Sequence, residues 1–351
     1  MAQMKKMVFL TRPIAPPWDE ASKNFAVYLA THIHIPNIQF LLLTTSTRLP
    51  KLPSHVTQIP IHITKALTLQ SKLRLFWYLL RTDVKHFHSL FVFTPLTGFV
   101  IKTLKIIRGF KIIQTVSALS KYHVLSFTVF GDEVVCFSQT TANILNGNGI
   151  RASVIPPAVP LEIFKATKKE NIIAFLGELH RQKSYAIVNK LIDLLLISLP
   201  DYQIITGFRT IRKPAEEKKL VQKLKQKYAK SDRVTFVDVV EDMPKLLGKT
   251  KLVVFPATAV TEKFDYPLVL LESLASATPV VISSIGPLGE LTILPGVLTP
   301  SQNSAEAFLT VIMKTLNSFQ KHSNDARMTA EKHFSIHNVA KKYEALYKKI
   351  L

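Results

Sequence analysis

The sequence predicts an α/β protein made of two doubly wound parallel sheets. In both halves of the chain, short continuous apolar runs alternate with longer segments whose apolar residues recur at helical spacing. Continuous apolar strands are typical of parallel sheets that helices cover on both faces. A proline-rich connector at residues 152–164 separates the two series, and 351 residues suit two domains of about 150 residues each. We expect two such domains to face each other across a cleft.

The first half opens with a buried strand and a proline-rich loop, and then alternates. Strands are predicted where apolar and β-branched residues run together, and helices where they recur every three or four residues. Pro95 and Ser138 each stand near the start of a predicted helix, where both residue types are favoured. The predicted strands are 6–11, 38–45, 58–63, 84–93, 110–117 and 133–138, and the predicted helices are 19–33, 67–82, 94–107 and 138–149.

The second half repeats this alternation with shorter connections. Its apolar runs lie between helical segments rich in lysine and glutamate, as expected for helices that cover a parallel sheet. The predicted strands are 171–179, 202–208, 233–240, 252–257 and 279–283, and the predicted helices are 184–200, 214–229, 243–249, 267–277, 304–319 and 336–351. In such sheets ligands bind beyond the carboxyl ends of the strands, so the loops there are the predicted site.

Charge and cysteine content narrow the class of protein. The formal net charge is +21, of which residues 1–165 carry +12 and residues 166–351 carry +9, so the chain attracts phosphate-bearing partners. The single cysteine, Cys136, allows no intrachain disulfide and no cysteine-based zinc site, which fits a reducing cytoplasm. Neither a signal peptide nor an apolar run long enough to span a membrane is recognisable, so we expect a soluble or peripheral protein.

One acid stands out in the apolar stretch "FDYPLVLLESLASATPVVISS". Glu272 lies inside the predicted helix 267–277, among apolar and small residues. Such an acid is solvated at an edge of the fold, paired with another polar group, or part of a functional site. A solvated position on the helix surface is the commonest of these. A carboxylate facing the cleft could accept two hydrogen bonds from the vicinal hydroxyls of a ribose.

The stretch that contains Glu272 resembles the donor-site segment of GT-B glycosyltransferases of family 4. In that family a glutamate precedes small residues and Thr-Pro-Val-Val, and a second acid follows, here Glu290. The strand, loop and helix from Asn171, the histidines of "DVKHFHSLF", the connector and the last helix also resemble the family. The resemblance implies an N-terminal acceptor domain at 1–163, a nucleotide-sugar domain at 164–333, and a C-terminal helix at 334–351 that packs back on the first domain.

This resemblance implies a retaining, metal-independent hexosyltransferase that uses a nucleotide-diphosphate sugar and no cofactor. Glu272 would hold the donor ribose, Lys183 the diphosphate, and Gly177 would let the backbone approach it. A histidine, His86 or His88, would lie near the reacting sugar. The donor site would also include Leu268 and Glu290. No Asp-X-Asp metal motif occurs in the sequence. A glycan or lipid-linked acceptor, and a place in polysaccharide biosynthesis, follow from the same resemblance.

Several family positions carry other residues. The first donor-site acid is replaced by Phe264, and Glu178 stands where an arginine is usual. The N-terminal glycine pair is absent. Replacement residues are available nearby: Asp265 for the acid, with a catalytic role, Arg181 or Arg209 for the phosphate arginine, and Lys23 on the acceptor side. The alternative is a GT-B protein that has lost catalysis and binds or scaffolds.

Simpler interpretations stay open for several residues. Glu290 could cap the segment that follows it, and Lys183 could be a solvated lysine. The two histidines alternate in one strand and so share a face, but no third metal ligand is apparent, and a structural role is the default for at least one. No metal site is therefore predicted.

Two basic amphipathic segments, 71–81 and 102–111, are either ordinary packed helices or a peripheral attachment to an anionic membrane. We expect a cytoplasmic protein that could lie on the inner face of the plasma membrane. A nucleic-acid partner is not expected, because no motif that reads DNA or RNA is present.

Overall fold

The computed structural model of the chain folds into two compact units, each built around its own parallel sheet. Unit 1 comprises residues 1–158, 261–265 and 336–351, and unit 2 comprises residues 159–260 and 266–335. The structure describes residues 4–16, 18, 20–49, 52–119, 125–177, 179, 181–208, 215–259 and 264–351.

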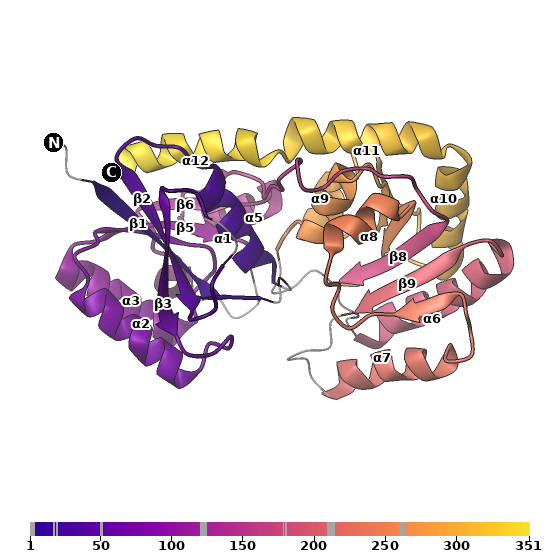
Figure 1. The fold of residues 1–351 in the computed structure, drawn as a ribbon, viewed down its shortest axis with the longest axis horizontal. Helices are drawn as coiled ribbons and strands as arrows, with labels where there is room; N and C mark the ends of the chain where they lie inside the picture. The colour runs from indigo at the N-terminus through magenta and orange to yellow at the C-terminus, as the bar shows by residue number, and fades with distance from the viewer. Residues whose placement is uncertain are drawn as a thin grey trace. The chain divides into compact units, whose positions relative to one another are not determined.

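Unit 1 contains a seven-stranded sheet whose strands all pair in parallel, in the order β3-β2-β1-β4-β5-β6-β7. The strands are β1 Lys5–Ile14, β2 Ile38–Thr45, β3 Val56–His62, β4 His86–Ser89, β5 Lys111–Val116, β6 Glu133–Cys136 and β7 Ser153–Val154 (Figure 1). The helices are α1 Ala21–His32, α2 Leu69–Arg81, α3 Pro95–Arg108, α4 Leu125–Thr128, α5 Gln139–Gly147 and α12 Ile336–Ile350.

The two faces of this sheet pack against different helices. Alternate residues such as Val8, Leu41 and Phe87 form a core with apolar residues of α2 and α3. On the other face, His88 packs against the rings of Tyr343 and Tyr347 of α12, and Phe9 packs against His88. The helix 336–351 therefore belongs to the first unit, as predicted.

Unit 2 contains a six-stranded parallel sheet in the order β10-β9-β8-β11-β12-β13. The strands are β8 Ile172–Gly177, β9 Gln203–Phe208, β10 Val234–Phe236, β11 Leu252–Phe255, β12 Val280–Ile282 and β13 Val297–Leu298. The helical segments are α6 Arg181–Ser198, α7 Ala215–Lys227, α8 Met243–Lys249, α9 Leu268–Ala275, the 3₁₀ helix η1 Gly286–Leu291, α10 Ala305–Asn317 and α11 Phe319–His333. The predicted fold class, two Rossmann-like parallel-sheet domains, is confirmed.

Helix α11 was not predicted as an element of its own. Its buried positions are occupied by Ser323, Ala326, Thr329 and Ala330 rather than by large apolar residues. Small side chains let α11 pack closely against α9, but they leave no apolar periodicity in the sequence.

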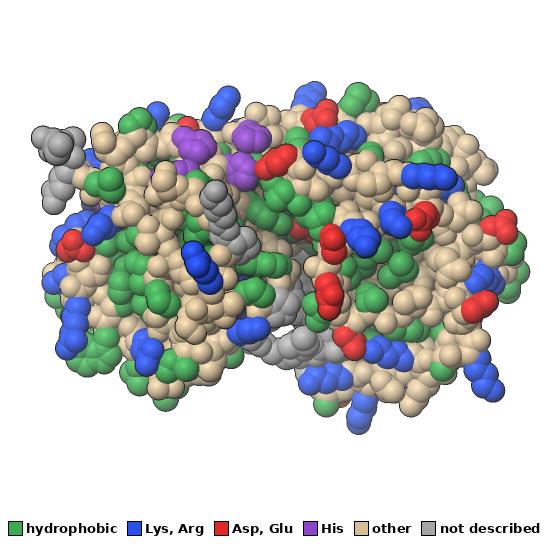
Figure 2. Space-filling view, viewed as in Figure 1, with side chains coloured by type: hydrophobic (Ala, Val, Ile, Leu, Met, Phe, Trp, Pro, Cys, Tyr) green, Lys and Arg blue, Asp and Glu red, His purple; other side chains and the backbone are tan. Residues whose placement is uncertain are grey.

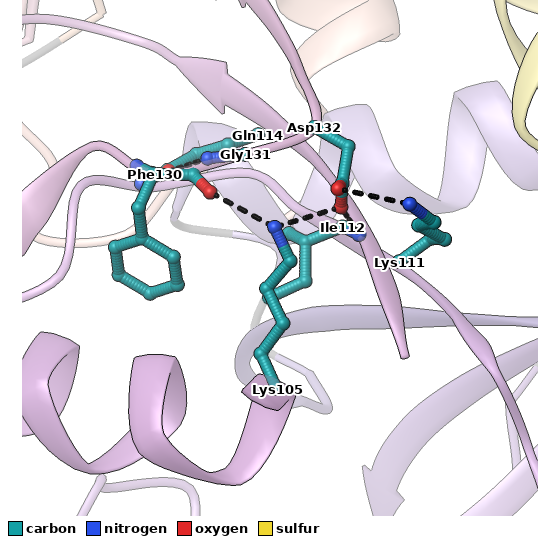
Figure 3. A network of polar contacts seen from close by, with 7 residues as sticks. All are labelled: Lys105, Lys111, Ile112, Gln114, Phe130, Gly131 and Asp132. Atoms are coloured by element: carbon teal, nitrogen blue, oxygen red, sulfur yellow. Dashed lines mark hydrogen bonds and ion pairs between the residues drawn. The ribbon is translucent and has the colours of Figure 1, made fainter. Parts of the chain in front are cut away.

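A carboxylate, that of Asp132, fixes the turn before β6 in unit 1 (Figure 3). Asp132 accepts a hydrogen bond from the amide of Ile112 at 2.8 Å and pairs with Lys105 at 2.9 Å and with Lys111 at 3.5 Å. These favourable contacts lower the pKa of Asp132 although its burial alone would raise it. Lys105 of α3 is thus tied to the sheet.

A glutamine completes the same network (Figure 3). The side-chain oxygen of Gln114 accepts hydrogen bonds from the amides of Phe130 and Gly131, at 3.0 and 3.3 Å. Its nitrogen donates to the carbonyl of Thr128 at 2.7 Å. The buried side chain of Gln114 thereby provides hydrogen-bond partners for three backbone groups between residues 128 and 131.

No helix among the described residues is long and apolar enough to cross a lipid bilayer.

Candidate donor site

The sheet of unit 2 changes winding direction between β8 and β11. From β8 the chain adds β9 and β10 on one side, and then returns to add β11, β12 and β13 on the other. In doubly wound sheets the loops at such a switch point diverge, and ligands bind beyond the carboxyl ends of the strands there.

Gly177 ends β8 at this point. Its backbone has φ of 124°, which side-chain-bearing residues rarely adopt, and a Cβ atom there would lie 2.8 Å from Cε2 of Phe255 at the end of β11. Both the conformation and the space therefore require glycine. The ring of Phe255 occupies the space that a side chain at position 177 would need, and the approach of a diphosphate to this backbone stays a prediction.

Helix α6 follows β8 and begins at Arg181, so its amino end lies at the same edge of the sheet. Lys183, in the first turn, is exposed, and the next residue, Ser184, is buried with its hydroxyl 2.9 Å from that of Thr258. Free amides and the helix dipole favour an anion here. The Arg181 side chain, Glu178 and Arg209 lie outside the described residues.

Glu272 lies in the second turn of α9, and its side chain is almost fully buried, with 5% exposed. The described residues donate no hydrogen bond to its carboxylate, whereas its backbone carbonyl accepts from Ser276 in the ordinary way. Burial without a partner raises the pKa of Glu272 to about 8. A buried carboxylate in this state is poised to accept hydrogen bonds from a ligand.

The amino end of α9 also lacks a side-chain cap. Pro267 occupies the N-cap position and provides no side-chain hydrogen bond, and the buried Leu268 is the first helical residue. The first amides of a helix have no intrahelical acceptor, so they are available to an anion unless another group takes them. The assignment of Leu268 to the donor site stays a prediction. In that assignment Leu268 acts through its backbone amide.

Glu290 lies in η1 and is held by a neighbouring tyrosine. The hydroxyl of Tyr266 donates to Oε2 of Glu290 at 2.7 Å, and Tyr266 itself is buried just before α9. This hydrogen bond links the two segments that flank α9. One carboxylate oxygen of Glu290 is thus bonded to Tyr266, and a direct contact of Glu290 with the donor stays a prediction.

Asp265 belongs to unit 1 and contacts other residues of that unit. Its carboxylate accepts a hydrogen bond from the hydroxyl of Ser138 at 2.6 Å, and its amide donates to the carbonyl of Ser117 at 2.8 Å. The preceding residue, Phe264, packs its ring against those of Phe25 and Phe137. These contacts are structural, and a catalytic role for Asp265 stays a prediction.

One of the two histidines of β4 is predicted to lie near the reacting sugar. His88 is fully buried, with Nδ1 2.6 Å from the hydroxyl of Tyr347 and Nε2 2.8 Å from that of Thr115. Burial lowers the pKa of His88 to about 3, so the ring is neutral and both nitrogens are already paired. His88 fastens α12 to the sheet.

His86 is the first residue of β4, at the amino end of the strand. Ligands of parallel sheets bind at the opposite edge. Burial, reinforced by the charge of Lys5, lowers the pKa of His86. The paired ring of His88 and the place of His86 at the start of β4 indicate structural roles, and a place for either histidine near the reacting sugar stays a prediction.

Lys23 lies in α1, which follows β1, the strand at the switch point of the unit 1 sheet. Its side chain is buried, with 3% exposed, and its ammonium group donates to the carbonyl of Ala15 at 3.2 Å. A buried cation at this edge is compatible with the predicted acceptor side, which stays a prediction.

Two doubly wound parallel units, with a last helix that returns to the first, define the GT-B class of glycosyltransferase fold. Residues 161–333 match the family of glycosyl transferases group 1, which confirms the resemblance predicted from the sequence. The narrower assignment to family 4 stays a prediction.

Solved structures share this fold over the whole chain. Sucrose-phosphate synthase from Thermosynechococcus elongatus is 17% identical, with a TM-score of 0.76 and 99% of each chain covered. HepE from Anabaena, in complex with UDP and glucose, is 15% identical, with a TM-score of 0.72 and 99% of this chain and 100% of HepE covered. A glycosyltransferase from Rickettsia africae is 14% identical, with a TM-score of 0.72 and 100% of this chain and 99% of its own covered. A search of curated proteins found no match.

Sequence reasoning missed three polar residues of the site region: Tyr266, Ser184 and Thr258. Tyr266 stands between an acid and a proline in the donor-site segment, and only that position hinted at a role. Ser184 and Thr258 are ordinary loop or helix-start residues in the sequence, and the pairing of their hydroxyls depends on how β8 and β11 lie together.

Proposed function

We propose that this protein transfers a sugar from a nucleotide-diphosphate sugar to a glycan or lipid-linked acceptor, with retention of the anomeric configuration and without a metal ion. The nucleotide sugar occupies the carboxyl edge of the unit 2 sheet, and unit 1 receives the acceptor. The family match of residues 161–333 and the binding of UDP-glucose by HepE support this assignment.

The observation that carries the proposal is the buried carboxylate of Glu272, to which no residue in the described part of the chain donates a hydrogen bond. Two vicinal hydroxyls of a ribose donate to its two oxygens, and the ligand supplies the hydrogen bonds that the described residues do not. These bonds favour the ionised carboxylate and so lower the pKa that burial has raised. An ammonium or hydroxyl-rich ligand of another kind would also pair with it, which makes nucleotide selectivity the decisive measurement.

Departure of the diphosphate requires fixed positive charge. Lys183 and the amino end of α6 provide it at the end of β8, and the uncapped amino end of α9 provides further amides. Preorganised donors of this kind stabilise developing negative charge without reorganisation. These donors favour a mechanism in which the protein itself offsets the charge of the departing diphosphate. The sequence contains no Asp-X-Asp motif that would hold a metal ion for this purpose.

A melting experiment with a matched pair of variants tests the proposal. UDP, GDP and ADP, and the corresponding sugars, are added to the wild type, to Glu272→Ala and to Glu216→Ala, an exposed acid on α7 that serves as the control. One nucleotide at about one hundred times its Kd should stabilise the wild type and the control by about 2.7 kcal/mol. Glu272→Ala should lose this gain. If no nucleotide raises the melting temperature of the wild type, the donor-site assignment is wrong.

Turnover is tested with the nucleotide sugar that stabilises. Release of the nucleotide, with transfer or slow hydrolysis, should occur in the wild type and be abolished in Glu272→Ala. The anomeric configuration of the first product, observed by NMR, tests retention. Activity that persists in a chelator supports the metal-independent mechanism, and activity that requires an added divalent ion contradicts it.

A second function is favoured by the loop before α9. Phe264, at the position of the usual first acid, is part of an aromatic cluster, and Asp265 is engaged by Ser138. A GT-B protein that binds a nucleotide or a glycan without turnover is consistent with both observations. Nucleotide-dependent stabilisation without release of nucleotide from any sugar donor would favour this binding or scaffolding function over the enzyme.

A further inference from the structure

Helix α2 exposes an apolar stripe. Leu69, Leu73 and Trp77 recur every four residues and therefore share one side of the helix. They are 74%, 52% and 50% exposed, although the opposite side of α2 packs on the sheet through Leu79. Large apolar side chains on a soluble surface usually occur singly, so a row of three marks an interaction surface.

Helix α3, which lies next to α2, exposes a second stripe. Leu96, Phe99, Ile106 and Ile107 fall on one side of α3 and are 76%, 56%, 75% and 68% exposed. Phe127 of α4, which packs against α3, is also exposed. The two stripes belong to neighbouring helices of the same layer, so together they form an extended apolar face, here called the α2–α3 face.

The cations of these two helices surround the apolar stripes. Neither helix contains an aspartate or a glutamate, whereas α2 carries Lys72, Arg74 and Arg81, all exposed. Arg81 lies over the ring of Trp77, 4.9 Å from its centroid. Lys102 of α3 lies over the ring of Phe127 at 5.6 Å. Figure 2 shows hydrophobic and basic side chains next to one another over the region where Figure 1 draws α2 and α3.

We infer that the α2–α3 face docks on an anionic lipid bilayer, with its leucine, isoleucine and aromatic side chains among the acyl chains and its cations at the headgroup phosphates. A helix with large apolar residues on one side and lysine or arginine beside them is the arrangement that lies in a membrane interface. Tryptophan is favoured there because one end of the ring is apolar and the other polar.

Charge selects the membrane over a second copy of the chain. A symmetric dimer would bring the same face of each copy together. The cations of α2 would then repel those of its partner, in a protein whose net charge is already +21. Anionic headgroups complement these cations. A bilayer therefore neutralises their charge, which the same face of a second copy cannot do.

Tryptophan fluorescence tests the inference directly. The chain has only two tryptophans, Trp18 and Trp77, so the variant Trp18→Phe reports from α2 alone. Vesicles of phosphatidylcholine and phosphatidylglycerol in equal parts should shift its emission to shorter wavelength and protect it from a water-soluble quencher. Vesicles of phosphatidylcholine alone should have little effect. Unchanged emission with anionic vesicles contradicts the inference.

Binding variants separate a specific face from a general attraction of charge. Lys72→Gln with Arg74→Gln should weaken vesicle binding roughly twentyfold or more, at about fivefold for each cation. Lys218→Gln with Lys219→Gln, on exposed positions of α7 in unit 2, removes the same charge elsewhere and should change binding far less. Equal losses in both pairs would show that net charge alone drives binding.

The apolar contribution has its own matched pair. Leu73→Ser with Trp77→Ser should weaken binding at least about tenfold, because apolar burial is lost. Ile197→Ser, a change at a side chain that is 79% exposed on α6, should not. Circular dichroism melts confirm that each variant folds. If the wild type ignores vesicles but forms dimers that Leu73→Ser with Trp77→Ser dissociates, the face is a contact between copies and the inference is wrong.

This inference does not rest on the proposed catalytic chemistry. Glu272→Ala, which removes the carboxylate of the donor site, should bind anionic vesicles as the wild type does. Loss of nucleotide binding and loss of membrane binding are therefore measured in separate variants and can fail separately.

Discussion

The carboxylate of Glu272 makes a prediction that stability measurements alone can check. The change is Glu272→Gln, which keeps the shape of the side chain and removes its ionisation. Because burial raises the pKa of Glu272 from 4.5 to about 8 in the folded protein, the folded state binds its proton more tightly than the unfolded state does. Between those two pH values, stability therefore falls as the pH rises. Glutamine cannot ionise and escapes this loss.

The size of the effect follows from the two pKa values. Each tenfold difference in proton affinity is worth about 1.4 kcal/mol. At pH 7 the acid is ionised in the unfolded chain but still mostly protonated in the folded protein, so the unliganded protein is less stable by about 3 kcal/mol than at low pH, and above pH 8 this loss approaches about 5 kcal/mol. Glu272→Gln should match the wild type at pH 4.5 and exceed its free energy of unfolding by about 3 kcal/mol at pH 7.

Urea unfolding of both proteins between pH 4.5 and 8.5 provides the assay. Other titrating groups contribute equally to both proteins, so the difference between the two curves isolates Glu272. A difference that stays constant with pH would refute the argument, since it would mean that the carboxylate is ionised in the folded protein without cost.

Ligand binding gives an independent check of the same carboxylate. Ribose hydroxyls favour its ionised form, so nucleotide binding near pH 7 should release protons. Calorimetry in two buffers of different ionisation enthalpy measures this release, which Glu272→Gln should abolish.

Three further changes test the surrounding structure. Gly177→Ala should destabilise the protein by about 2–4 kcal/mol, because it adds a close contact to an unfavourable φ. The control Gly149→Ala, where φ is 75° and the space is open, should cost only about 1 kcal/mol. Equal losses of stability in the two variants would contradict the close contact at Gly177. Ala277→Gly should raise stability by about 0.5–1 kcal/mol in thermal unfolding, since Ala277 has φ of 53° after α9, and a loss would show that its methyl group matters more. Tyr347→Phe should cost about 1–3 kcal/mol by leaving Nδ1 of His88 unpaired, and unchanged stability would contradict the role given to that hydrogen bond.

The division into two parallel-sheet units was readable from local patterns. Strands such as β2 and β8 are buried on both sides, so each contains a continuous apolar run, and that pattern is visible without any knowledge of their neighbours. Helix α11 was missed for the opposite reason, because its buried positions carry small residues.

The site was predictable only in part. Glu272 stands out in the sequence because an acid is unusual among apolar residues, and Gly177 stands out through the resemblance to a family. The surroundings of the histidines were not predictable, since a strand shows which residues share a face but not what lies opposite that face. For His88 the opposite face holds Tyr347, 259 positions away in the chain.

Sequence alone determined the fold class and the family resemblance, and it singled out Glu272 as a candidate, because each depends on residue type and on short spacing. Tertiary structure decided the rest: that the Glu272 side chain is buried with no hydrogen-bond partner among the described residues, that the ring of His88 is paired with Tyr347, and that Asp265 is bound to Ser138. These depend on contacts between segments far apart in the chain, and such contacts leave no periodicity or local composition to read.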